Sequence, residues 1–201
     1  MKITIVGLGL IGASMAKALG RVALVAGVDT RGRTVRQAMD EGVIAEGSVD
    51  TAVASGSDVV VLAVPVGSVV ETAWRVIRHI GDDTVLTDTG STKAHIVESI
   101  ERIFPSFVGS HPIAGREDPG YASSRADLFD GAATIITPTE KTRPGCIDRV
   151  RTLWETCGST THTMDPAGHD RLMAMVSHLP HLLSYVSMRL ADDLHLHRQF
   201  L

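Results

Sequence analysis

The chain opens with a short apolar strand pattern that runs directly into a glycine-rich turn. Residues 2–6 read KITIV, residues 7–12 read GLGLIG, and a helical pattern follows from Ala13 to Leu19. In a strand–turn–helix unit of this spacing, the first glycine permits the tight turn, the second lets the backbone approach a pyrophosphate, and the third lets helix and strand pack closely. The N–H groups at the helix N-terminus then face the phosphates. The motif predicts a dinucleotide-binding site with cofactor contacts at Gly7, Gly9, Leu10, Ile11 and Gly12.

An acidic residue follows this motif at the distance expected for a ribose contact. A second apolar run, residues 22–28, ends in Asp29, 17 residues beyond Gly12, where a carboxylate can accept hydrogen bonds from the ribose hydroxyls of NAD. Arg31 and Arg33 come just after it, and guanidinium groups there could hold the 2′-phosphate of NADP. Because Asp29 would repel that phosphate, we expect NAD rather than NADP. A glycine turn that serves packing alone is the alternative interpretation of the motif.

Composition argues against several other classes of protein. The chain has 201 residues, enough to bury the core of one domain. Its net charge is −4 and it has no basic run, so nucleic acid is not an expected partner. Its longest apolar runs, such as residues 59–66, are too short to cross a bilayer, and its N-terminus has no signal-peptide pattern. Cys146 and Cys157 fit no metal or redox motif, so we expect no metal and a cytoplasmic location.

Apolar β-branched runs alternate with helical patterns through the first two thirds of the chain. This alternation is typical of a parallel sheet with helices on both faces. Strands are expected near residues 2–6, 22–28, 58–64, 84–88, 107–109, 132–137 and 159–163. Helices are expected near residues 11–20, 33–41, 67–79, 92–103 and 145–157. The predicted fold class is therefore α/β, with a Rossmann-type, doubly wound, mostly parallel sheet.

The pattern changes at Asp165 and Pro166, after which no further strand is expected. Aspartate suits a helix cap and proline suits the first helical turn. We expect residues 1–164 to form a dinucleotide-binding domain and residues 165–201 to be the start of an incomplete helical domain. About 35 residues cannot form a domain by themselves. This short, truncated helical segment is therefore expected to pack on the sheet domain or on another chain.

Three segments besides the glycine turn lie at the carboxyl ends of predicted strands, where open α/β sheets bind ligands. Val64 and Pro65 close the third strand, where they would flank the cofactor or simply form the turn into the next helix. Ser91 opens a later helix, either as its N-cap or as a hydroxyl that bonds a catalytic group or the cofactor. Lys93 beside it is interpreted as a solvated lysine of the first helical turn.

His111 lies at the carboxyl end of the fifth predicted strand, in a loop bracketed by Gly109 and Gly115. A core histidine is less expected there than on an apolar helical face. A neutral imidazole at the ligand edge of the sheet can accept a proton from a substrate hydroxyl while hydride leaves the same carbon. His111 is therefore a candidate general base.

The helical tail contains two histidines at a spacing that places them on one face. His178 and His181 are three residues apart, which would suit a metal pair. No third ligand is near them in the sequence, and Pro180 distorts the turn between them. Contact with an anion or a carboxylate is therefore favoured over metal binding.

The motifs taken together resemble one family. The matching segments are GLGLIG with Asp29, TDTGSTK at 87–93, GSHPIAGRE at 109–117, ADLFDG at 126–131, MDPAGHD at 164–170 and SHLPHLLS at 177–184. In this order, over residues 1–190, they are similar to the prephenate dehydrogenase family of tyrosine biosynthesis, including its arogenate-using relatives. GSHPIAG and SHLPH are far more specific than the glycine turn.

The resemblance implies roles for individual residues. His111 resembles the catalytic histidine that bonds the ring hydroxyl of the substrate and accepts its proton. Ser91 resembles the serine that orients this histidine and contacts the cofactor. Glu117 matches an acidic residue near the substrate pocket, and His181 matches a histidine directed toward the substrate from the helical domain. His178 is expected to support helix packing instead.

The implied reaction is the oxidative decarboxylation of prephenate to 4-hydroxyphenylpyruvate, with hydride passing to NAD. Arogenate or a related cyclohexadienyl acid is the alternative substrate. The resemblance ends near the C-terminus, because family members continue into further helices that build a dimer and carry an arginine for the substrate carboxylate. Arg189 and Arg198 match no such motif. A catalytically impaired NAD-binding module is therefore a second alternative, and a homodimer through the helical segment is expected.

Overall fold

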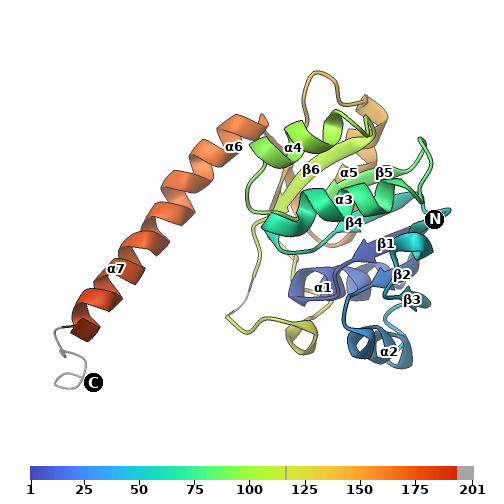
Figure 1. Ribbon diagram of the computed structural model, residues 1–201, viewed down its shortest axis with the longest axis horizontal. Helices are drawn as coiled ribbons and strands as arrows, with labels where there is room; N and C mark the ends of the chain where they lie inside the picture. Colours follow the sequence, from blue (N-terminus) through green and yellow to red (C-terminus); the bar gives the residue numbers. More distant parts are fainter. Residues whose placement is uncertain (116, 194–201) are drawn as a thin grey trace.

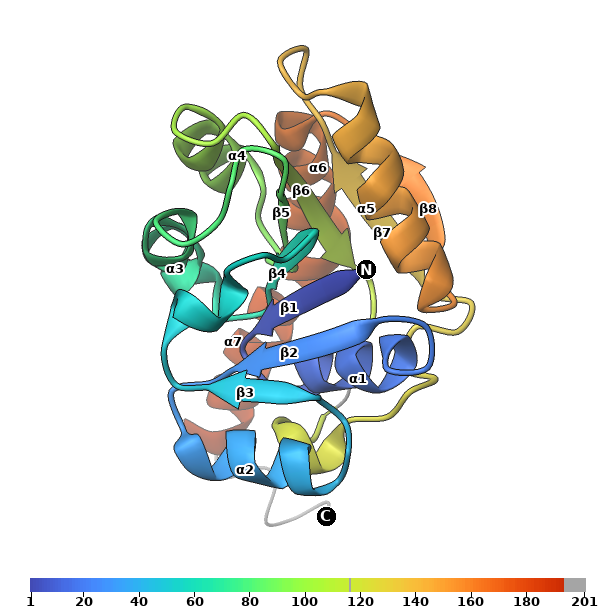
Figure 2. The same ribbon diagram turned by 90° about the vertical axis from the view of Figure 1, so that its right-hand side faces the viewer.

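An eight-stranded sheet forms the centre of the computed structural model, which describes residues 1–115 and 117–193. The strand order is β3-β2-β1-β4-β5-β6-β7-β8 (Figure 1, Figure 2). The strands are β1 (Lys2–Val6), β2 (Leu24–Val28), β3 (Glu46–Ser48), β4 (Val59–Leu62), β5 (Val85–Asp88), β6 (Phe107–Pro112), β7 (Ala133–Thr137) and β8 (Thr160–Thr163). All neighbours are parallel except β6 and β7. The predicted α/β fold with a mostly parallel, Rossmann-type sheet is confirmed.

Helices connect the strands and then continue beyond the sheet. The α-helices are α1 (Leu10–Leu19), α2 (Gly32–Asp40), α3 (Val69–Ile77), α4 (Ala94–Glu101), α5 (Pro144–Thr156), α6 (Pro166–Met173) and α7 (Leu179–Asp193). Short 3₁₀ turns are η1 (Thr51–Ala54), η2 (Val66–Ser68) and η3 (Tyr121–Ser123), and η4 (Ala174–His178) is a π-helical turn between α6 and α7. Within the described ranges, no helix is both long enough and apolar enough to cross a membrane.

Apolar side chains on the two faces of the sheet form two separate cores. On one face, Ile3 and Ile5 of β1 pack in a cluster with Trp154 of α5. On the other face, Leu62 of β4 packs in a cluster with Ile100 of α4. Because both faces of the sheet are covered, β4 is buried along its whole length, and its sequence is a continuous apolar run.

The register brings the carboxyl ends of four strands to one edge of the sheet. Val6 of β1 pairs with Leu62 of β4, and Leu62 pairs with Asp88 of β5. In β6, Val108 lies opposite Thr87, so this strand continues past the end of β5. The strand order also reverses direction between β1 and β4, which is where open α/β sheets bind ligands. The glycine turn and the end of β6 therefore meet at the expected binding edge.

Two details of the sheet differ from the sequence prediction. The short strand β3 was not predicted, because Glu46, Gly47 and Ser48 carry no apolar alternation, and it is held as an edge strand by pairing with β2. His111 does not lie in a loop as predicted. It is part of β6, which is extended by antiparallel pairing of His111 with Ile135 of β7.

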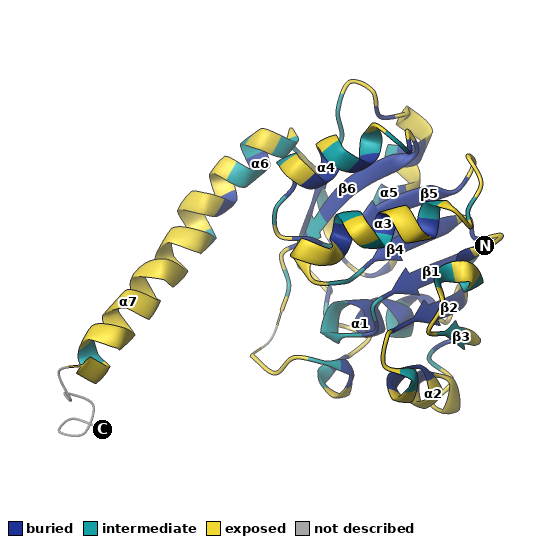
Figure 3. Ribbon diagram, viewed as in Figure 1, coloured by how far each residue is buried: buried dark blue, intermediate teal, exposed yellow. Residues whose placement is uncertain are grey.

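The helical segment leaves the sheet after a short contact. Helix α6 packs against α4, whereas α7 projects away from the rest of the described chain (Figure 1). Figure 3 shows α7 exposed along almost its whole length. Arg198 and the rest of residues 194–201 of the predicted helical segment lie outside the described residues.

Candidate active site

Each glycine of the turn after β1 meets a different steric requirement. Gly7 has a φ of +100°, and a Cβ there would overlap the carbonyl oxygen of Ala63. A Cβ on Gly12 would overlap the carbonyl oxygen of Gly7, so this glycine lets α1 pack closely on the turn. A Cβ on Gly9 would meet nothing within 4 Å. The second glycine therefore borders open space, where a ligand can approach the backbone.

Helix α1 begins at this open space with its amide groups available. Gly9 occupies the N-cap position, and no described side chain caps the first turn, which starts at Leu10. Uncapped N–H groups at a helix N-terminus favour a bound anion. Val64, half-buried, touches the turn near Gly7, and Pro65 is exposed beside it. The arrangement fits the pyrophosphate of a dinucleotide, as the sequence predicted.

Asp29 directly follows β2 and is tied to the glycine turn. Its Oδ2 accepts a hydrogen bond from the backbone N–H of Leu8 at 2.9 Å, and its Oδ1 accepts from the backbone N and the Nε of Arg31 at 2.9 and 3.2 Å. Burial alone would raise the pKa of Asp29, but these hydrogen bonds, chiefly that from the Arg31 side chain, hold it below its usual value. The carboxylate is therefore ionised, and its oxygens have further lone pairs for ribose hydroxyls.

His111 lies at the same edge of the sheet, in a chain of three polar side chains. Its Nδ1 is 2.9 Å from Nε2 of His169, a fully buried residue of α6. The two rings meet edge to face, with centroids 5.1 Å apart. Nδ1 of His169 is in turn 2.8 Å from Oδ1 of Asp170. His169 and Asp170 belong to the motif MDPAGHD at 164–170, from which no role was predicted for either residue.

The surroundings of His111 keep its imidazole neutral. The pKa of His111 is lowered to about 4, first by burial and then by the nearby His169, Lys93 and His178, while Asp170 opposes the shift. At neutral pH the half-buried ring is therefore unprotonated and carries a lone pair that can accept a proton. This is the protonation state that a general base needs.

Lys93 is buried, which corrects the prediction of a solvated lysine. Its side chain is fully inaccessible to solvent, forms an ion pair with Asp88, and donates a hydrogen bond to the carbonyl oxygen of Ser110 at 2.9 Å. Burial lowers the pKa of Lys93, and the Asp88 carboxylate opposes that change. Asp88 also accepts hydrogen bonds from the backbone N–H groups of Gly90 and Ser110. The pair therefore fixes the backbone directly before His111.

Ser91 is not the N-cap of α4, so that alternative for this residue is wrong. Helix α4 begins at Ala94, and the first free N–H groups donate to Asp170: Lys93 N to Oδ1 at 2.7 Å and Ala94 N to Oδ2 at 2.9 Å. Ser91 is exposed and makes no hydrogen bond with a described residue. In this structure Nδ1 of His111 is bonded by His169, not by Ser91. The cap comes from a distant helix, which local sequence cannot reveal.

The remaining candidates lie on exposed positions around this edge. Glu117 is exposed in the loop after β6. His181 is exposed in the first turn of α7, where its Nδ1 bonds the carbonyl oxygen of Ser177 at 2.9 Å. His178 is also exposed, and its role in helix packing stays a prediction. A positive charge on His178 would lower the pKa of His111.

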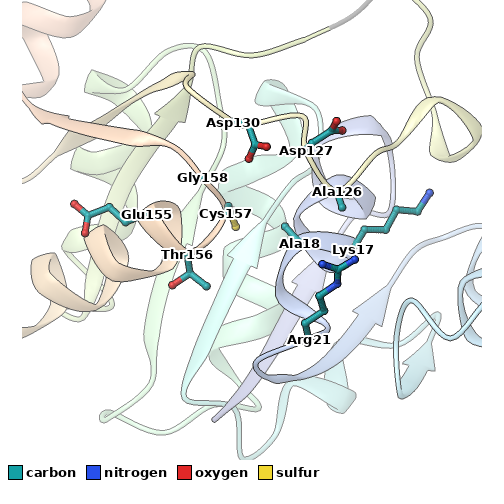
Figure 4. A pocket seen from close by; sticks show the side chains of 10 residues that line it. All are labelled: Lys17, Ala18, Arg21, Ala126, Asp127, Asp130, Glu155, Thr156, Cys157 and Gly158. Carbon is teal, nitrogen blue, oxygen red and sulfur yellow. The ribbon is translucent and has the colours of Figure 1, made fainter.

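A separate hollow of about 370 Å³ lies elsewhere on the molecule (Figure 4). It is bordered by Lys17 of α1, Arg21 just after that helix, Asp130 of the loop before β7, and Glu155 of α5. None of the predicted site residues lines it, so it is not the dinucleotide site. Among residues 1–115 and 117–193, no three His, Cys, Asp or Glu side chains are grouped to hold a metal ion.

The low pKa of His111 predicts a loss of stability in acid. In the unfolded chain this histidine titrates near 6.5, whereas in the folded chain it titrates near 4. Between these values the unfolded state binds a proton that the folded state does not, so the free energy of unfolding falls as the pH falls through this window. Urea denaturation at about pH 7 and about pH 4.5 should show a smaller loss for His111→Asn than for the unmodified chain. Equal losses would contradict the assignment.

Comparison with known proteins identifies the family. A family model described as "Prephenate dehydrogenase, nucleotide-binding domain" matches residues 13–163. Over 91% of its length, the chain is 32% identical to a cyclohexadienyl dehydrogenase of Zymomonas mobilis, and over 90% it is 31% identical to a prephenate dehydrogenase of Bacillus subtilis. The chain spans 64% and 51% of the lengths of these two relatives.

A solved structure extends this similarity to three dimensions. The crystal structure of prephenate dehydrogenase from Aquifex aeolicus, in complex with hydroxyphenyl propionate and NAD⁺, matches with a TM-score of 0.92 and 34% identity. The match covers 96% of this chain and 70% of that one. The family model, the relatives and the shared fold agree with the resemblance found in the sequence motifs. The chain therefore belongs to the prephenate dehydrogenase family.

Proposed function

We propose that this chain binds NAD and catalyses the oxidative decarboxylation of prephenate to 4-hydroxyphenylpyruvate, a step of tyrosine biosynthesis. One observation carries the proposal: a neutral, half-buried His111 stands at the same sheet edge as an uncapped glycine turn. We assign residues 1–164 to cofactor binding and residues 165–201 to the start of a helical substrate and dimerisation domain. Membership of the family supports both assignments.

The cofactor fits the open space at the glycine turn. A Cβ at Gly9 would project into that space without meeting protein, and the uncapped N–H groups of α1 suit a pyrophosphate. We propose cofactor contacts at Gly7, Gly9, Leu10, Ile11, Gly12, Asp29, Val64, Pro65 and Ser91. When bound, NAD supplies the hydride acceptor of the reaction. Because Asp29 is ionised and would repel a 2′-phosphate, NAD is favoured over NADP.

The protein residues would then orient the substrate and take its proton. His111 would accept the proton of the ring hydroxyl as the carbon that bears it loses hydride. Loss of carbon dioxide gives an aromatic ring, so the overall change is strongly downhill and the main tasks of the protein are positioning and polarisation. We propose that Ser91 lies between His111 and the cofactor, and that Glu117 and His181 face the substrate.

Two other functions have specific support. Arogenate or a related cyclohexadienyl acid is one alternative substrate, since a relative at 32% identity is a cyclohexadienyl dehydrogenase. An NAD-binding module without turnover is the other, because the matching family model describes a nucleotide-binding domain. Steady-state assays of the purified chain separate these cases by following NADH absorbance. We expect turnover with prephenate and NAD to exceed turnover with arogenate or NADP. A higher rate with arogenate would change the substrate, and no turnover in a chain that binds NAD would favour the module.

The glycine turn predicts different effects for two matched substitutions, one on stability and one on NAD binding. Gly12→Ala should lower the free energy of unfolding by about 1–3 kcal/mol, because its Cβ overlaps a backbone carbonyl that cannot move freely. Gly9→Ala should leave stability nearly unchanged but weaken NAD binding, because its Cβ would occupy the space for the pyrophosphate. Urea denaturation and calorimetric titration with NAD measure both effects. Unchanged NAD affinity in Gly9→Ala would argue against a cofactor at this turn.

We further propose that the chain works in the cytoplasm as a homodimer joined through its helical segment. Both cysteines are buried free thiols, as suits a reducing compartment. Helix α7 exposes a stripe of large apolar side chains at helical spacing, Leu182, Leu183, Val186 and Leu190. An exposed stripe of this kind is typical of an interaction surface.

Sedimentation analysis tests the dimer. We expect the unmodified chain to sediment as a dimer and the double variant Leu183→Glu, Val186→Glu to sediment as a monomer, because buried charges would oppose association. Met188→Glu is the control, since Met188 is exposed on the opposite side of α7. A monomeric unmodified chain, or a dimer that survives the double substitution, would contradict this interface.

A further inference from the structure

We propose that His169 and Asp170 are positioning residues that set the tautomer of His111 and take over the positive charge when His111 accepts a proton. The inference rests on the proposed role of His111 as proton acceptor. It concerns two residues that begin the helical segment, 58 and 59 positions along the chain from the histidine they serve.

Asp170 fixes the direction of the two hydrogen bonds that link His111, His169 and Asp170. Its carboxylate accepts from the backbone N–H groups of Lys93 and Ala94 at 2.7 and 2.9 Å, so both oxygens act as acceptors. Burial alone would raise the pKa of Asp170, but these bonds and the one from His169 hold it below its usual value. An ionised carboxylate can only accept. The nitrogen 2.8 Å away, Nδ1 of His169, must therefore carry the hydrogen.

The tautomer of His169 then determines that of His111. With its hydrogen on Nδ1, a neutral His169 has a lone pair on Nε2. The only hydrogen-bond partner of that nitrogen among the described residues is Nδ1 of His111, at 2.9 Å, which must donate. The hydrogen of neutral His111 is therefore on Nδ1, and its lone pair is on Nε2. That nitrogen has no hydrogen-bond partner among the described residues, so it is available to a substrate hydroxyl.

Burial makes this arrangement rigid. His169 is fully buried, so water cannot replace either of its hydrogen bonds, and an unmade bond would leave a buried polar nitrogen unsatisfied. Asp170 is also fixed, because it caps the N-terminus of α4. The same two residues therefore attach α6 to the sheet domain and hold the His111 ring.

The charges around His111 give the hydrogen bonds among His111, His169 and Asp170 a second role. His169 of α6, Lys93 before α4 and His178 of η4 disfavour a positive charge on His111, whereas Asp170 of α6 favours one. When Nε2 of His111 accepts the hydroxyl proton, its Nδ1 proton can pass to Nε2 of His169. His111 is then neutral with its hydrogen on Nε2, and His169 is an imidazolium in contact with the Asp170 carboxylate. The substrate O–H bond breaks as the Nε2–H bond of His111 forms, and the Nδ1–H bond of His111 breaks as the Nε2–H bond of His169 forms, so the two histidines together gain one proton.

Nitrogen-15 NMR of the chain with labelled histidines tests the tautomer without any assay of activity. We expect the His111 resonances to show a protonated Nδ1 and an unprotonated Nε2 at neutral pH. A protonated Nε2 would overturn the inference, even if His111→Asn abolished turnover and so upheld the proposed function. Conversely, an active His111→Asn variant would remove the proposed base and leave the tautomer measurement intact. The two failures are therefore distinguishable.

His169→Asn is the matched variant, because an asparagine amide can still donate to Asp170 but does not reach His111. We expect the His111 tautomer to change and kcat to fall on the order of 10²-fold, with KM and NAD affinity changed little. His162→Asn, at an exposed position of β8, is the control and should change none of these. A folded His169→Asn variant with unchanged kcat and an unchanged His111 tautomer would overturn the inference.

Discussion

Replacing His111 with Asn is expected to lower kcat by about 10²–10⁴-fold, the usual contribution of a general base. Asparagine has no basic nitrogen, but its amide occupies the position of Nδ1 and can still donate to His169. The fold and the glycine turn should therefore persist, and NAD affinity should change by less than about twofold. Steady-state kinetics and calorimetric titration with NAD measure the two quantities.

The control for this substitution is His79→Asn, because His79 is exposed in the turn that follows α3. It should leave both kcat and NAD affinity unchanged. If His111→Asn retains the kcat of the unmodified chain, the proton goes elsewhere and the proposed base is wrong. If it loses NAD affinity in parallel with kcat, His111 is part of the cofactor site instead.

Replacing Lys93 with Met is expected to lower the free energy of unfolding by about 3–5 kcal/mol. Methionine fills similar space, so the main loss is the ammonium group, which leaves the Asp88 carboxylate buried without its charge partner. The carbonyl oxygen of Ser110 also loses its hydrogen bond from Lys93. Because Ser110 directly precedes His111, we expect reduced activity as well. Urea denaturation followed by circular dichroism measures the stability.

Two further variants isolate the buried ion pair. Lys141→Met at an exposed position should change stability by less than about 0.5 kcal/mol. Adding Asp88→Asn to Lys93→Met removes the unpaired charge and should recover part of the lost stability. A loss below about 1 kcal/mol in Lys93→Met, comparable to a surface ion pair, would show that the interaction is not essential to the fold.

The sequence contained enough information for the sheet and the cofactor edge. The glycine turn after β1 and the acidic end of β2 depend on local steric and charge requirements, which are visible in consecutive residues. The buried strands appear as apolar runs for the same reason. The three residues of β3 could not be predicted, because Glu46, Gly47 and Ser48 have neither periodicity nor β-branched side chains and are held by pairing with β2.

The candidate site was predicted only where its residues lie in local motifs. His111 was identified from its position at a strand end and from the family resemblance. Its contact with His169 joins residues far apart in the sequence and depends on where α6 packs. The burial of Lys93 likewise depends on how β5, α4 and β6 enclose it. The available signal was Asp88 at a strand end with a lysine five residues later, a spacing that did not indicate an ion pair by itself.

The product balance of the purified chain supplied with NAD and prephenate tests whether it catalyses oxidative decarboxylation. We expect NADH, carbon dioxide and 4-hydroxyphenylpyruvate to form in equal amounts, because one hydride and one carboxylate leave each substrate molecule. NADH formed without carbon dioxide would contradict oxidative decarboxylation. A folded, NAD-binding chain that forms none of the three would contradict the proposal that these residues are sufficient for catalysis.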